Sequence, residues 1–91
     1  MLHVLICTDK PGHLALRQAN REAHLAHLRS DAAVLQAGPF VNAAGEMCGS
    51  LIVFDTDDRA HVEAFAAADP YARAGLFVEV RIEAWNRVVG S

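Results

Sequence analysis

The sequence predicts an α+β domain of element order β-α-β-β-α-β, with a four-stranded antiparallel sheet that carries both helices on one face. Two strands give the clearest signal. Residues 76–85 alternate apolar and charged side chains, and residues 47–55 contain a continuous apolar run. Residues 13–29 and 58–68 show helical spacing of apolar side chains. With right-handed crossovers, the first and third strands should lie side by side and antiparallel.

The remaining strands follow from local composition. Residues 1–8 form an apolar, β-prone run, which is typical of a central strand. Residues 33–40 form the second strand, and because Pro39 cannot donate a ladder hydrogen bond, we expect this strand at an edge of the sheet. Residues 41–46 then connect it to the third strand as a hairpin loop.

The first helix, residues 13–29, carries charge close to the core. Its leucines fall on one stripe, Arg21 sits inside that stripe, and Arg17 and His24 lie along its edge. Charged side chains are rarely buried without a partner. The sequence therefore predicts a polar seam between this helix and the sheet.

The end of the second helix delivers a carboxylate to the same region. Pro70 disfavours helical geometry in the residue before it, so the helix should end near residue 68 and Asp69 should cap a new short turn. Gly75 can supply the left-handed residue that ends this turn. If Val62 and Phe65 face inward, the helical period places Asp69 on the inner face as well.

Composition limits the classes of partner. The chain of 91 residues reads as one domain, residues 1–91, and its net charge of −3 without a basic cluster argues against nucleic acid and anionic membranes. No apolar run is long enough to span a membrane, and residues 1–8 are no signal peptide. Helices on one face leave the other face of the sheet open, so we expect a homodimer that pairs through its sheets.

Two cysteines cannot make a disulfide framework. Cys7 and Cys48 form no CxxC pair, and we expect reduced thiols in a cytoplasmic protein. If the first and third strands are neighbours, the two cysteines should nevertheless lie near each other.

A set of short motifs runs in order along nearly the whole chain: Arg21-x-x-His24-Leu25-x-x-Leu28, Gly38-Pro39, Gly49-Ser50, Ala68-Asp69-Pro70-Tyr71, Gly75-Leu76-Phe77 and Trp85. Together they resemble the YciI-like (YCII-related) family. The resemblance implies ferredoxin-like subunits that pair as a dimeric α+β barrel, in a superfamily that includes muconolactone isomerases and small monooxygenases. It also implies that the presumed active-site His and Asp of the family correspond to His24 and Asp69. Elimination of HCl from a chlorinated, hydroxylated ring is one chemistry associated with the group.

His24 and Asp69 are therefore the candidate catalytic pair. A histidine titrates close enough to neutral pH to act as a general base, and a carboxylate can orient its ring. The alternatives are structural: a packed helix histidine, and an aspartate that only caps the turn after Pro70.

Four further residues are candidate substrate contacts. Arg17 and Arg21 can bind an anionic or phenolate group, or instead form salt bridges, to Asp69 or Glu22. Ser50 can bind a substrate oxygen or be a satisfied strand serine. Tyr71 can line a pocket or plug the core.

The pattern favours a cofactor-independent enzyme of lyase or isomerase type, working by acid–base chemistry on a small polar or aromatic molecule. Because His24 and His27 are not backed by an HExxH motif or a cysteine pair, we expect no metal and no cofactor. The rival interpretation is a non-catalytic dimer that binds a small molecule or a protein. A third is a cofactor-free monooxygenase of the same barrel type.

Overall fold

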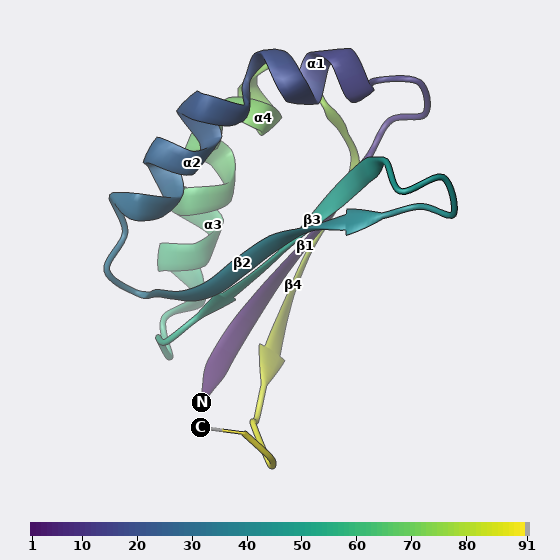
Figure 1. Cartoon of the computed structure of the whole chain (residues 1–91). Coiled ribbons are helices and arrows are strands. Elements are labelled where there is room, and N and C mark those ends of the chain that lie inside the picture. Colours follow the sequence, from purple (N-terminus) through teal and green to yellow (C-terminus); the bar gives the residue numbers. More distant parts are fainter. Residues whose placement is uncertain (91) are drawn as a thin grey trace.

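The computed structural model describes residues 1–90 and confirms the predicted α+β class and strand order. Its elements are β1 (Leu2–Asp9), α1 (Leu14–Ala19), α2 (Arg21–Arg29), β2 (Val34–Val41), β3 (Met47–Phe54), α3 (Arg59–Ala68), α4 (Pro70–Arg73) and β4 (Phe77–Trp85). The strands form one sheet in the order β2-β3-β1-β4, and every neighbouring pair is antiparallel. Figure 1 shows all four helices on one side of this sheet, which is the ferredoxin-like arrangement.

The sheet positions agree with the sequence. The strands β1 and β3 are central and paired, and the proline-containing β2 is an edge strand. Cys7 faces Ser50 across the β1–β3 ladder, so Cys48 lies nearby on the neighbouring strand, and both thiols are free in the structure. Their redox state in solution stays a prediction.

The single helix predicted over residues 13–29 is wrong, because the segment forms two helices that meet at Asn20. Asn20 leaves helical geometry, and its side-chain amide donates to the carbonyl of Leu16. Asparagine competes with the backbone in this way, and it is therefore common at helix ends. The interruption breaks the helical period, with the result that Arg17 and His24 are buried and Arg21 is exposed.

The connection from α3 to β4 is built as predicted. The carboxylate of Asp58 caps α3, and that of Asp69 accepts a hydrogen bond from the backbone N–H of Tyr71 and caps α4. Pro70 occupies the first position of α4, where its missing N–H is harmless. Gly75 adopts a φ of +78°, which a glycine tolerates without strain, and the chain then enters β4.

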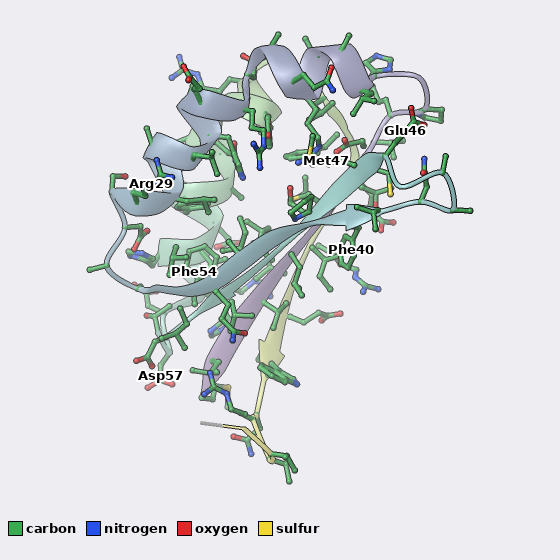
Figure 2. All side chains as sticks on the ribbon, viewed as in Figure 1. Arg29, Phe40, Glu46, Met47, Phe54 and Asp57 are labelled. Atoms are coloured by element: carbon green, nitrogen blue, oxygen red, sulfur yellow. The ribbon has the colours of Figure 1, made fainter. Side chains whose placement is uncertain are left out.

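The core lies between the sheet and the helices. Leu5 of β1, Ile52 and Phe54 of β3, and Val62 and Phe65 of α3 are buried there. The rings of Phe54 and Phe65 meet edge to face with centroids 5.0 Å apart, and Figure 2 shows Phe54 on the helix side of the sheet. No helix within residues 1–90 is long and apolar enough to cross a membrane.

The other face of the sheet carries no helix (Figure 1). On this face Ile6 of β1 lies opposite Leu51 of β3, and both side chains are half-buried. Phe40 and Trp85 are exposed large apolar side chains. An apolar hollow of about 370 Å³ runs along this face from Ile6 to Trp85.

Candidate active site

A small cleft opens between the helices and the sheet, with a volume of about 120 Å³. Its polar lining comes from Arg17, Arg21, His24, Ser50 and Tyr71. Its apolar lining includes Leu25, Leu28, Met47 and Ile52, and Figure 2 shows Met47 at the start of β3. The structure thus brings five of the six sequence-predicted residues to one cleft, and the sixth, Asp69, lies behind His24.

The expected proximity of His24 and Asp69 is confirmed. The Nδ1 atom of His24 lies 2.9 Å from Oδ1 and 3.0 Å from Oδ2 of Asp69, and both side chains are buried. Oδ1 also accepts the backbone N–H of Tyr71 at 2.9 Å. The carboxylate therefore caps α4 and holds the imidazole at the same time.

This arrangement determines the tautomer of His24. An ionised carboxylate only accepts hydrogen bonds, so Nδ1 must carry the proton that lies between the two side chains. The neutral ring then has its free electron pair on Nε2. Within residues 1–90 no group hydrogen-bonds Nε2, and no buried side-chain nitrogen or oxygen is left without a partner, so Nε2 is open to the cleft.

Tyr71 packs against two of the basic side chains of the cleft, His24 and Arg17. Its ring stacks on the imidazole of His24, with centroids 4.0 Å apart and an angle of 17° between the planes. The guanidinium carbon of Arg17 lies 4.4 Å from the centre of the same ring. Burial raises the pKa of the Tyr71 hydroxyl, against the opposing charges of Arg17 and Arg21, so the hydroxyl keeps its proton at neutral pH.

Arg17 does not pair with Asp69 or Glu22, the two partners considered from the sequence. It forms a buried, two-pronged ion pair with Asp9 at the end of β1, with Nε–Oδ2 2.7 Å and Nη2–Oδ1 2.9 Å. Nη2 also donates to the hydroxyl oxygen of Ser50 at 2.9 Å. Burial lowers the pKa of Arg17, but the hydrogen bonds and charge of Asp9 outweigh it, and the net direction is upward.

Sequence reasoning missed Asp9. The strand predicted over residues 1–8 stops one residue short of it, and an aspartate is ordinary in the turn that follows a strand. Strand alternation was the signal that could have found it, because Asp9 follows Leu5 and Cys7 at a period of two on the core-facing side. A carboxylate on that side needs a cationic partner, and Arg17 is eight residues away.

Arg21 is exposed at the mouth of the cleft. Within residues 1–90 its guanidinium forms no salt bridge or side-chain hydrogen bond, in contrast to that of Arg17. It is thus a cation available to a ligand entering the cleft.

The thiol of Cys7 is buried. Burial, and to a lesser degree the negative charges of Asp69 and Asp9, raise its pKa to about 12, and the charge of Arg17 opposes them. A thiol with such a pKa is a packing group and a poor nucleophile at neutral pH.

The histidines do not gather into a metal centre in the described part of the chain, where no group of three or more potential ligands is found. His27 lies beside His24 on α2, but its Nε2 contacts the backbone carbonyl of Phe65 at 3.0 Å. Its ring also stacks on that of Phe65 at 4.0 Å. His27 therefore belongs to the packing between α2 and α3.

The amino-acid sequence matches a known protein family. Residues 1–86 match the YCII-related domain. The chain belongs to this family. It is 33% identical to "Protein YciI" of Escherichia coli O6:H1 over 97% of this chain and 99% of that protein. It is also 30% identical to a protein of Haemophilus influenzae, with the same coverage of both chains.

Solved structures extend the comparison. The 5-chloro-2-hydroxyhydroquinone dehydrochlorinase TftG of Burkholderia phenoliruptrix, in complex with 2,5-dihydroxybenzoquinone, superposes with a TM-score of 0.87. It is 33% identical, and the match covers 94% of both chains. A putative antibiotic biosynthesis monooxygenase of Nitrosomonas europaea, 15% identical with a TM-score of 0.58 over 98% of this chain and 92% of its own, shares the fold alone.

Proposed function

We propose that this YCII-related protein is a cofactor-independent enzyme that removes a proton from a small hydroxylated ring, in an elimination or an isomerisation. The observation that carries the proposal is the His24–Asp69 pair, with Nδ1 committed to the carboxylate and Nε2 open to the cleft. Such a ring nitrogen is a general base, and the carboxylate stabilises the imidazolium that forms when it takes the proton.

The cleft also limits the substrate. An apolar cavity of about 150 Å³ holds a benzene molecule, so a cleft of about 120 Å³ encloses part of a single ring and leaves its substituents toward solvent. The exposed guanidinium of Arg21 at the mouth favours a phenolate or another anionic substituent. The similarity to TftG, a dehydrochlorinase, supports elimination of HCl as the first reaction to test.

The test is chloride release from 5-chloro-2-hydroxyhydroquinone. Removing a general base typically lowers the rate by about 100-fold to 10,000-fold, and we expect a loss in this range for His24→Gln. His61→Gln is the matched control, because His61 is an exposed histidine on α3, outside the cleft. Equal rates for wild type and His24→Gln would contradict the proposal. A wild type that binds 2,5-dihydroxybenzoquinone without any turnover would support the binding-module alternative.

We also propose that two copies pair through the face of the sheet that carries no helix. This face presents the hollow lined by Ile6, Leu51 and Trp85, and contiguous exposed apolar area of this kind marks an interaction surface. An identical copy brings a matching apolar hollow, and a two-fold axis makes the contact self-complementary. Sedimentation should show a dimer at micromolar concentration and a monomer for Leu51→Glu. A wild type that sediments as a monomer would contradict pairing.

A further inference from the structure

A second buried polar cluster, made of Asp9, Arg17 and Ser50, borders the cleft through Arg17 and Ser50, and the general-base proposal does not use it. We propose that this cluster binds the oxygen on which negative charge develops during the reaction, with the Ser50 hydroxyl as the donor. Asp9 and Arg17 are its positioning residues. The inference rests on the proposed function and assigns the substrate a ring oxygen that faces Ser50 while His24 removes a proton.

The direction of the hydrogen bonds carries the argument. A guanidinium can only donate, so the bond from Arg17 Nη2 makes the Ser50 oxygen an acceptor. The hydroxyl proton of Ser50 must therefore point elsewhere. No other group in residues 1–90 hydrogen-bonds the side-chain hydroxyl of Ser50. Because Ser50 lines the cleft, this O–H is free to donate to a bound molecule.

The ion pair makes this geometry rigid. Asp9 holds Arg17 through two parallel bonds, of 2.7 and 2.9 Å, and such a fork fixes the guanidinium plane. A donation from a charged group also polarises the Ser50 hydroxyl, which strengthens its own donation. A donor fixed before the reaction, in a site with little water, stabilises developing charge more than a mobile one.

The same contacts argue against Ser50 as a nucleophile. A nucleophilic serine needs a base that takes its proton. Within residues 1–90 the Ser50 oxygen bonds only to a guanidinium, which cannot act as a base. The base of the cleft, His24 Nε2, makes no hydrogen bond to the Ser50 hydroxyl within residues 1–90.

For elimination of HCl, the step balances without an oxidant or reductant. The ring reacts as its keto tautomer, in which the proton of one hydroxyl has moved to the carbon that bears chlorine and made that carbon tetrahedral. His24 Nε2 takes the proton of another ring hydroxyl, the electron pair of that O–H bond forms a C=O bond, and a ring double bond shifts to the chlorine-bearing carbon. The chloride leaves with the electrons of its C–Cl bond. Ser50 keeps its proton throughout and donates a hydrogen bond to the oxygen that carries charge, and the imidazolium afterwards releases its proton to water.

The experiment compares variants that keep or lose the hydroxyl group at residue 50. The measured quantity is the rate of chloride release from 5-chloro-2-hydroxyhydroquinone. Loss of one oxyanion donor lowers kcat by about 100-fold or more, so we expect that loss for Ser50→Ala with KM little changed. Ser50→Thr keeps the hydroxyl and should recover most of the rate. Ser30→Ala is the matched control, since Ser30 is an exposed serine at the end of α2.

A double variant tests the positioning residues. Asp9→Asn with Arg17→Met removes both buried charges together, which lets the protein fold, and should lose about as much kcat as Ser50→Ala because the hydroxyl is no longer fixed. A folded double variant with wild-type kcat would overturn the role of the ion pair.

The outcomes separate the two proposals. If His24→Gln is inactive while Ser50→Ala keeps the wild-type kcat, the oxyanion assignment is overturned and the general base stands. If the wild type releases no chloride and calorimetry detects no binding of 2,5-dihydroxybenzoquinone, both proposals fall. If it binds the quinone, weaker binding by Ser50→Ala supports donation from Ser50, and unchanged binding together with an unchanged kcat overturns it.

Discussion

The two buried charged clusters of the cleft are built in different ways. The His24–Asp69 pair joins a titratable ring to a carboxylate and leaves Nε2 open to the cleft. The Asp9–Arg17 pair joins a permanent cation to a carboxylate by two parallel bonds, and Arg17 also donates a hydrogen bond to Ser50. The first can gain and lose a proton, whereas the second holds its charge at every physiological pH. The His24–Asp69 pair is therefore suited to proton transfer, and the Asp9–Arg17 pair is suited to fixing the position of a hydrogen-bond donor.

The largest expected effect is on the free energy of unfolding, when the buried Asp9–Arg17 ion pair is broken. Asp9→Asn leaves the Arg17 guanidinium buried without its counter-charge, which should lower the free energy of unfolding by about 3–5 kcal/mol. Urea unfolding measures this loss. Adding Arg17→Met should restore most of it, since the unpaired charge is then gone.

Glu63→Gln is the control for that series, because Glu63 forms an exposed ion pair with Arg59 on α3. Exposed pairs contribute little, so this variant should unfold as the wild type does. A loss for Asp9→Asn no larger than that for Glu63→Gln would show that the Asp9–Arg17 pair does not hold its charges in a buried, low-dielectric site.

The buried thiol of Cys7 should make the protein sensitive to alkali. Its folded pKa of about 12 is raised above the unfolded value of about 8.5. A group of this kind contributes stability that is complete below the unfolded pKa and is lost as pH rises toward the folded one. The free energy of unfolding, measured in urea at pH values from about 8 to about 11, should show this decline. The decline should be flatter in Cys7→Ala. A slope unchanged in Cys7→Ala but flattened in Cys48→Ala would contradict the assignment.

A smaller effect is expected at Tyr71, which contacts both clusters. The chain has a single tyrosine, so the near-ultraviolet absorbance of phenolate reports Tyr71 alone. Burial raises its pKa, and the charge of Arg17 opposes that rise. The titration should therefore move to higher pH on folding, and move up again when Arg17→Met and Asp9→Asn are combined. A downward movement in the double variant would contradict the placement of Arg17 beside the ring.

The sequence predicts the His24–Asp69 cluster better than the other, because Asp69 has a local signal of its own and the family resemblance pairs it with His24. The Asp69-Pro70-Tyr71 segment caps its own turn, and the helical period from Val62 and Phe65 places Asp69 on the inner face. The strand order was also predictable, since alternation and the proline of β2 indicate central and edge positions.

The Asp9–Arg17–Ser50 cluster depends on contacts between three elements that no local pattern specifies. Arg17 comes from α1, Asp9 from β1 and Ser50 from β3, and their meeting requires the sheet register and the angle of α1 together. The break at Asn20 sets that angle, and a single asparagine within a helical period gives little warning of it. The prediction that Arg21 lies inside the leucine stripe is therefore wrong, since Arg21 is exposed, and Arg17, predicted at the edge of that stripe, is buried.

The role of His24 as a general base can be tested by its tautomer, read from the ¹⁵N shifts of the ring at a pH where the ring is neutral. We expect a proton on Nδ1 and none on Nε2 in the wild type, because Asp69 accepts from Nδ1. Asp69→Ala should give a mixture of both tautomers. A wild-type ring that is protonated on Nε2 would contradict the account, since the nitrogen facing the cleft would have no electron pair with which to take a proton.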